Sequence, residues 1–263
     1  MLKVKTPSWL IPPIRLELPA ESIHIWRVDL GVGSATLQRF ARMLSLDECQ
    51  RAEQFRFERD RNRFIVGRGA LRCLLGQYLE IEPSQLQFRY GATGKPELWV
   101  ADGEATLHFN VSHSQDLMLC AIAQHQPVGI DVEYCRSIPN LSQLTQHFFA
   151  HQEHVAIQAL PPDLQPMLFF QYWTCKEALL KATGIGIQDL KKIEVMIADG
   201  IVQQMQWNLE AQHQPQFGIE LFCPASEYMA AIAIHHHEPF PPTSSQSQHG
   251  LMSVPCKFWQ WPE

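Results

Sequence analysis

The sequence predicts an α+β protein of two similar α+β lobes related by a pseudo-twofold axis, each with a long helix packed on an antiparallel sheet. Two long helix-like segments, 61–79 and 164–183, are each followed by short strand-like runs. The strand end AIAQH at 121–125 also resembles AIAIH at 231–235. Chance explains so short a match equally well, so the order of helix and strands carries more weight. We expect the two lobes at residues 1–127 and 128–237.

The first lobe begins with a strand at 23–30, where apolar and polar residues alternate with a period of two. Ser45 and Glu48 then form a capping-box pair that predicts a short helix. The following helix at 61–79 carries apolar residues at nearly helical spacing, and Pro83 prevents its extension. Two strand-like runs, 107–112 and 117–123, predict a hairpin with a polar turn at 113–116.

The second lobe begins with a strand at 128–134, before a helical region from Leu141 onward. Gly184 and Gly186 are expected to end the helix at 164–183. The last strands are expected at 193–198, 217–222 and 228–234. The segment 238–263 is a tail rich in Pro, Ser and Gln that is too polar to build a core, although Phe258, Trp259 and Trp261 could dock its end.

The composition favours a globular cytoplasmic protein. Of the 263 residues, 46% are hydrophobic, and none of the apolar stretches approaches the roughly 20 residues of a membrane helix. Prolines interrupt the start MLKVKTPSWLIPP before a secretory hydrophobic region can form. The seven cysteines are scattered without a CxxC pair, which suggests neither disulfides nor a zinc site.

Arginine is concentrated between Gln38 and Arg72, where nine arginines stand against five acids in a chain of net charge −6. A cationic region on an acidic protein implies a local anionic ligand. A solvated helix face is an equally good interpretation of any single arginine. Nucleic acid is not favoured, because the overall charge is negative and no recognition motif accompanies the arginines.

Two acids on one strand are the sharpest local feature. In VGIDVEY, Asp131 and Glu133 are two residues apart, so both carboxylates project to the same side of the strand. A cation or solvent must neutralise such a pair, and all-oxygen ligands favour Mg²⁺, Mn²⁺ or Ca²⁺ over zinc. The spacing alone fits an exposed strand edge better than a metal site.

Three further segments carry polar groups that could add to a site for a metal or an anion. In the second long helix, Trp173, Glu177 and Lys181 share one face, with Lys176 at its edge, although an ordinary surface ion pair is the simpler interpretation. Ser112-His113 at a strand end can donate hydrogen bonds, and Lys95 lies on a turn that lacks a P-loop pattern. The run 235–237 of three histidines fits a fraying strand end better than a metal site.

Four motifs together resemble the 4′-phosphopantetheinyl transferases, specifically the larger, two-lobed surfactin-synthetase-activating type. They are GKP at 94–96, FNVSHS at 109–114, GIDVE at 129–133 and WTCKEALLK at 173–181, in the family's order and approximate spacing. The resemblance covers about residues 20 to 235. It implies a monomer that binds coenzyme A in the cleft between the lobes and transfers its phosphopantetheine arm to a serine of an apo acyl or peptidyl carrier protein, releasing 3′,5′-ADP.

The resemblance also implies roles for individual residues. It places Mg²⁺, or Mn²⁺, on Asp131, Glu133 and Glu177. Contacts to coenzyme A are expected from Lys95, Ser112, His113 and Arg63, and by a looser match from Arg51. Glu177 is expected to accept the serine proton, with Glu153 assisting. Lys181 is expected to stabilise or protonate the departing 3′,5′-ADP, and Lys176 to add charge.

Two other functions remain open. A Mg²⁺-dependent nucleotide pyrophosphate hydrolase would use water in place of the serine hydroxyl. A noncatalytic carrier-protein-binding module would keep the fold without the chemistry, but the presence of Asp131, Glu133, Glu177 and Lys181 speaks against it. Neither nucleic acid nor a membrane is expected as a partner.

Overall fold

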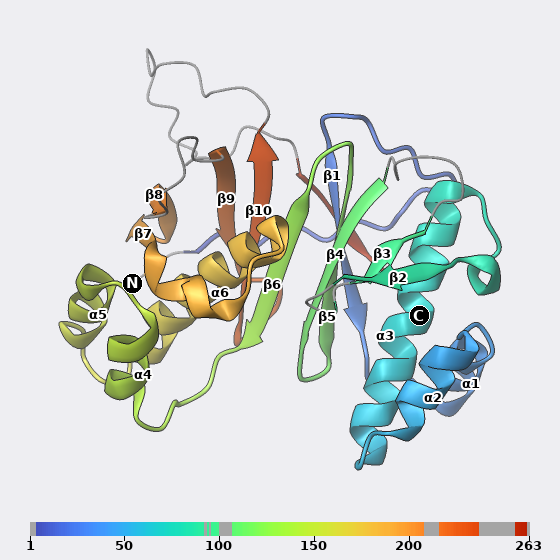
Figure 1. Ribbon diagram of the computed structural model, residues 1–263, viewed down its shortest axis with the longest axis horizontal. Coiled ribbons are helices and arrows are strands. Elements are labelled where there is room, and N and C mark those ends of the chain that lie inside the picture. Colours follow the sequence, from blue (N-terminus) through green and yellow to red (C-terminus); the bar gives the residue numbers. More distant parts are fainter. Residues whose placement is uncertain are drawn as a thin grey trace.

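The computed structural model describes residues 4–91, 94, 96–99, 107–207, 216–236 and 256–261. It has the two α+β lobes that the sequence predicts, lying side by side (Figure 1). No helix within these described ranges is both long enough and apolar enough to cross a bilayer.

The first lobe packs helices against a four-stranded sheet of order β11-β1-β5-β4. Its elements are β1 (Ile23–Asp29), α1 (Ser34–Ala41), α2 (Leu46–Glu53), α3 (Glu58–Leu79), the short 3₁₀ helix η1 (Pro83–Gln85), β2 (Phe88–Tyr90), β3 (Pro96–Leu98), β4 (Leu107–Ser114), β5 (Leu117–Gln124) and, from the chain end, β11 (Cys256–Gln260). The long helix α3 begins three residues earlier than predicted, and it ends where Glu80 takes the left-handed conformation, at φ 53°.

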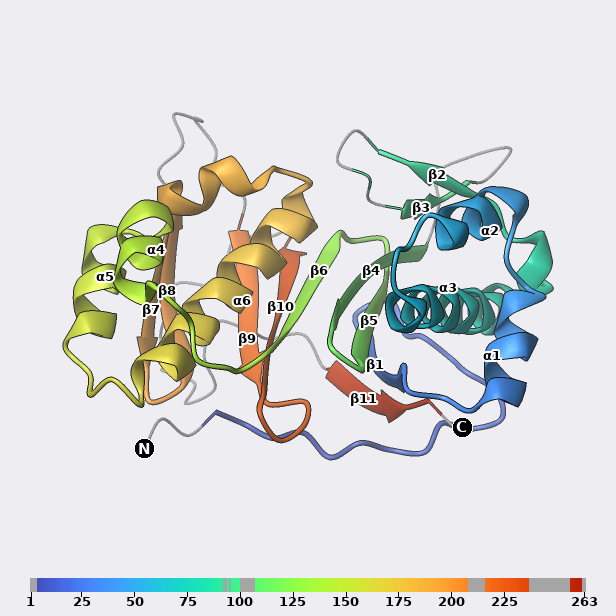
Figure 2. The ribbon, with the colours of Figure 1, turned by 90° about the horizontal axis from the view of Figure 1, so that it is seen from below.

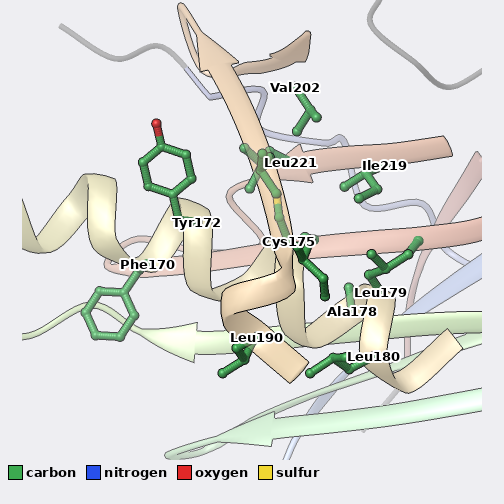
Figure 3. Packing of buried hydrophobic residues seen from close by; sticks show 14 of the residues in the cluster. Phe170, Tyr172, Cys175, Ala178, Leu179, Leu180, Leu190, Val202, Ile219 and Leu221 are labelled. Carbon is green, nitrogen blue, oxygen red and sulfur yellow. The ribbon is translucent and has the colours of Figure 1, made fainter. Parts of the chain in front are cut away.

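The second lobe packs helix α6 against the sheet β6-β10-β9. Its elements are β6 (Val128–Tyr134), α4 (Leu141–Phe148), α5 (His151–Gln158), α6 (Gln165–Thr183), η2 (Ile187–Lys192), β7 (Ile193–Ala198), β8 (Ile201–Trp207), β9 (Gln216–Phe222) and β10 (Tyr228–His236). Gly184 ends α6 at φ 73°, as predicted. Figure 3 shows Cys175 and Leu179 of α6 beside Ile219 and Leu221 of β9, in the core of this lobe.

The two lobes share one strand order. In the first, β1 pairs with β5 and β5 with β4; in the second, β6 pairs with β10 and β10 with β9, all antiparallel. In each lobe a long helix, α3 or α6, lies in sequence between the first and second of these strands. The similar segments AIAQ and AIAI lie in β5 and β10, the middle strands of the two arrangements. The two lobes (Figure 2) therefore repeat the same strand topology.

Several elements differ from the sequence-based expectations. The predicted turn at 113–116 is shorter, because Gln115 adopts a positive φ of 51° and lets both strands extend to a register of Ser114 with Leu117. The elements α1, β2, β3 and β8 were not predicted. The end of the polar tail forms β11, which pairs in parallel with β1 and brings Phe258 and Trp259 into buried positions.

Side chains join the two sheets along β4 and β6. The inward-facing polar residues of β4 stand two residues apart, and each accepts one backbone N–H of β6. Asn110 accepts from Ile130 at 2.9 Å, Ser112 from Val132 at 3.3 Å, and Ser114 from Tyr134 at 3.1 Å. We call this contact the β4–β6 seam. It satisfies a strand edge that would otherwise hold buried unpaired donors.

Gly129 allows α6 to approach β6 closely. A Cβ atom at this position would lie 2.0 Å from the carbonyl oxygen of Ala178 and 2.4 Å from the backbone nitrogen of Ala182. Both neighbours are backbone atoms, which cannot rotate away. The helix and the strand are therefore held at a separation that only glycine permits.

Replacing this glycine should destabilise the second lobe. We expect Gly129→Ala to lower the free energy of unfolding by about 1–3 kcal/mol or more, because α6 must move away from β6. Urea unfolding followed by circular dichroism measures the change. The control is Gly33→Ala, where an added Cβ meets no atom within 4 Å. Equal stabilities of the two variants would contradict the close packing.

Candidate active site at the seam

Asp131 lies at the centre of the seam and is 3% exposed. Its Oδ1 accepts hydrogen bonds from Lys181 Nζ at 2.6 Å and from Ser112 Oγ at 2.8 Å. Lys181 Nζ also donates to Ser112 Oγ at 3.0 Å. A residue from β4, one from β6 and one from α6 are thereby joined across the two lobes. Asp131 Oδ2 is buried and has no hydrogen-bond partner among the described residues.

Two more carboxyl groups lie close to Asp131. Burial, and then the charge of Asp131, raise the pKa of Glu133, while a hydrogen bond from Ser114 to its Oε2 at 2.9 Å opposes this. Burial, and then Asp131, also raise the pKa of Glu177, to which Glu133 adds and which Lys181 opposes. Three acids from β6 and α6 therefore repel one another in a partly desolvated place.

The chemistry of this acidic group fits a hard divalent cation. Its donors are carboxylate oxygens, and one of them is buried with no partner in the described ranges. Mutual repulsion among the acids is what a bound cation relieves. Across the described ranges, however, no three Asp, Glu, His or Cys residues stand in positions that could already hold a metal ion. The shared ion on Asp131, Glu133 and Glu177 stays a prediction from the sequence.

Cationic side chains approach the seam near His113, an exposed residue of β4. Desolvation by its neighbours, then the charges of Lys181 and Arg63, lower the pKa of its imidazole. Arg63 reaches over from α3 and binds Asp116 in the β4–β5 turn at 2.8 Å. Positive charge from α3 of the first lobe and from α6 of the second is thus brought near His113, and it disfavours the charged form of that imidazole.

A cleft of about 410 Å³ opens between the lobes beside this group. Glu177 and Lys181 line it from α6, and Asn110 lines it from β4. Its remaining walls are Gly94 and Pro96 of the β2–β3 hairpin, Phe109 and Val111 of β4, and Leu180 with residues 184–187 after α6. The lining thus combines apolar side chains with the charged Glu177 and Lys181, which suits a ligand with a phosphate and a neutral arm.

Lys176 and Glu153 form a buried pair away from this cleft. Lys176 is 0% exposed, and its Nζ donates to the carbonyl oxygens of Leu190 and Ile193 and to Glu153 at 2.5 Å. An ammonium group has three donors, so none is left for a phosphate of coenzyme A. This corrects the expected cofactor contact of Lys176.

Glu153 is equally occupied. It is 1% exposed, and besides Lys176 it accepts the backbone N–H groups of Ala150 and Val195, each at 2.8 Å. Burial raises the pKa of Glu153, and this effect exceeds the lowering by Lys176 and by the two N–H groups. The pair ties α5, α6 and β7 together. Glu153 therefore holds elements of the second lobe together. It does not line the cleft, so its location does not fit the expected help in proton removal.

The arginine-rich segment does not form a single ligand surface. Arg68 and Arg72 turn inward and bind the buried Glu48, at 2.8 Å and 2.7 Å through their Nε atoms. Arg51 is exposed on α2, with its guanidinium 5.6 Å from the centre of the Phe64 ring. The predicted ligand contact of Lys95 lies outside the described residues.

Sequence reasoning missed the structural role of β4. Ser112 was expected to contact a phosphate, but its hydroxyl is held by Asp131, Lys181 and the N–H of Val132. Asn110 and Ser114 were not singled out. Polar residues at every second position from His108 to Ser114, with apolar residues at 107, 109 and 111 between them, are the signal that could have found all three.

Comparisons with known proteins give a family. Residues 127–233 match the model described as 4′-phosphopantetheinyl transferase superfamily, and residues 33–125 match the model described as 4′-phosphopantetheinyl transferase, N-terminal. The 4′-phosphopantetheinyl transferase HetI of Nostoc sp. is 40% identical over 227 residues, covering 86% of this chain and 93% of that protein.

Two further relatives carry 4′-phosphopantetheinyl transferase names. A 4′-phosphopantetheinyl transferase of Bacillus subtilis is 26% identical over 210 residues, which cover 80% of this chain and 90% of that protein. A putative 4′-phosphopantetheinyl transferase of Synechocystis sp. is 41% identical over 145 residues, which cover 55% of this chain and 58% of that one. With matched segments in both lobes and a near-full-length relative, the chain belongs to the 4′-phosphopantetheinyl transferase superfamily.

Proposed function

We propose that this chain transfers the 4′-phosphopantetheine arm of coenzyme A to a serine hydroxyl of an apo carrier protein in the cleft at the seam. The observation that carries the proposal is the meeting of Asp131, Glu177 and Lys181 beside that cleft, on β6 and α6, which pack closely at Gly129. Family membership and the names of the relatives support the same activity.

The reaction joins the serine Oγ to the β-phosphorus of coenzyme A. The bond from that phosphorus to the bridging oxygen breaks, and 3′,5′-ADP departs with the bond electrons. The serine must lose a proton, and negative charge develops on the phosphoryl oxygens and on the leaving group. An active site for this reaction needs a base, fixed positive charge and exclusion of water.

Glu177 is suited to act as the base. It lines the cleft, and its raised pKa brings a carboxylate closer to the working pH, which improves proton acceptance. Lys181 lies one helical turn further along α6, and 28% of its side chain is exposed. Its ammonium group faces the buried Asp131 and also lines the cleft, where it can stabilise the charge on the departing 3′,5′-ADP.

We assign the divalent cation, Mg²⁺ or Mn²⁺, to Asp131, Glu133 and Glu177. When bound, the ion neutralises nonbridging phosphate oxygens and thereby favours both attack and departure. We assign contacts with the coenzyme A phosphates to His113 and Lys95, contact with the nucleotide end to Arg63, and a further phosphate contact to Arg51. The protein is proposed to act as a cytoplasmic monomer, without nucleic acid or a membrane as partner.

Glu177→Gln tests the base directly. We expect transfer to fall by at least about 100-fold, because general-base catalysis contributes about 10²–10⁴-fold. Intact-protein mass spectrometry of an apo carrier with coenzyme A and Mg²⁺ measures the added phosphopantetheine. Glu53→Gln, at an exposed position on α2, is the matched control and should keep the wild-type rate. Near wild-type transfer by Glu177→Gln would remove Glu177 from the mechanism.

The raised pKa values also predict how stability depends on pH. Because the folded state holds protons on Glu133 and Glu177 that the unfolded chain releases, stability is lost as pH rises from the ordinary carboxyl pKa through the raised values. In EDTA, Glu177→Gln should therefore melt above wild type at pH 7.5, with the difference vanishing below about pH 4.

The same experiment with Mg²⁺ reports on the ion. The added metal should raise the Tm of wild type more than that of Glu177→Gln, because it binds only the folded state and loses one ligand in the variant. Differential scanning calorimetry measures both shifts. Identical Mg²⁺ shifts in the two proteins would show that Glu177 does not contribute to the ion's site.

The rival activities give different products. A nucleotide pyrophosphate hydrolase would release 3′,5′-ADP from coenzyme A when no carrier is present, whereas a transferase needs the carrier. A binding module would retain the carrier and leave its mass unchanged. One assay with and without the apo carrier therefore separates the three functions.

A further inference from the structure

The β2–β3 hairpin forms one wall of the cleft without belonging to either large sheet. β2 and β3 pair only with each other in the described part of the chain, in a register that sets Tyr90 opposite Pro96. Gly94 and Pro96 line the cleft. A two-stranded hairpin is marginal by itself, so the location of this wall depends on what holds it to the lobe.

An ionic cluster lies directly behind the hairpin. Glu48 and Arg72 are each 1% exposed, and Arg72 also donates to the carbonyl oxygens of Pro83 and Leu86 at 2.9 Å. Burial disfavours the ionised form of Glu48, but Arg68 and Arg72 outweigh it, so its pKa is lowered. The carboxylate is charged, and it anchors both guanidinium groups to the start of α2.

Arg68 connects this cluster to the hairpin. Its Nε and Nη2 bind Glu48, and Nη2 also donates to the Tyr90 hydroxyl at 2.9 Å. The guanidinium lies 4.7 Å from the centre of the Phe88 ring and 5.8 Å from that of Tyr90. Phe88 in turn meets Phe109, a lining residue of the cleft, edge to face at 6.0 Å. One side chain therefore holds both residues of β2 that face the lobe.

We infer that Arg68 and Tyr90 are positioning residues, which hold the β2–β3 hairpin as a preformed wall of the cleft and so set the affinity for coenzyme A. This rests on the proposed function. Neither side chain lines the cleft, so they act through Gly94 and Pro96. A preformed wall avoids the entropy cost of ordering the hairpin when the ligand binds.

Tyr90→Phe is the sharpest test, because it removes one hydroxyl from a side chain that is 40% exposed. We expect the KM and the calorimetric Kd for coenzyme A to rise about fivefold, the size of one lost hydrogen bond, with kcat within about twofold. Arg68→Lys should act in the same direction, because an ammonium group cannot bridge Glu48 and Tyr90 while stacking on Phe88.

The control is Arg89→Gln in the same hairpin. Arg89 pairs with Glu97 at 3.0 Å, but both side chains are largely exposed, at 67% and 45%, so the pair contributes little. This variant should keep the wild-type Kd. Thermal unfolding of every variant separates affinity from stability: a purely structural role lowers the Tm and leaves the Kd unchanged.

The outcomes separate the inference from the function on which it rests. Unchanged Kd and KM in both Tyr90→Phe and Arg68→Lys, with an active wild type, would overturn the inference alone. Wild type that neither binds coenzyme A nor modifies a carrier would overturn both. A higher Kd in the two variants, with the control unchanged, would support the hairpin's role.

Discussion

The structure depends on the β4–β6 seam, where the carbonyl and hydroxyl oxygens of side chains replace a backbone ladder. Asn110, Ser112 and Ser114 accept successive N–H groups of β6, so the two sheets meet without merging into one. A continuous ladder would fill the space between strands with paired backbone. A join through short side chains instead leaves Ser112 free to donate toward Asp131, and the seam becomes polar in a largely apolar interior.

The seam also determines where charged side chains of α6 and β6 come together. Gly129 brings α6 against β6, so that Lys181 bonds Asp131 and Glu177 comes within electrostatic reach of the β6 acids. The resulting repulsion disfavours the folded state, a cost that active sites commonly carry. Under the proposed function, the acids that repel one another at neutral pH are the ones that would hold the cation. The pair Glu153–Lys176, in contrast, is fully hydrogen-bonded, and its contacts join α5, α6 and β7.

Local patterns predicted the elements whose period was clear, and they failed where a role depends on partners distant in sequence. The spacing in VGIDVEY and the glycine after α6 predicted β6 and the helix end, which the structure confirms. Nothing near Lys176 signals that Leu190 and Ile193 will bind its ammonium group, so a buried lysine was assigned to a ligand. β11 was missed as a strand because its partner β1 is more than 200 residues away.

The central claim is that Asp131, Glu133 and Glu177 share one divalent cation at the seam. Crystals grown with coenzyme A and Mn²⁺ test it most directly through anomalous scattering from manganese. The account predicts a single strong peak enclosed by the three carboxyl groups and a phosphate oxygen, and its loss in Asp131→Ala crystals. A peak held by other side chains, or coenzyme A bound in the cleft with no metal beside these acids, would contradict it.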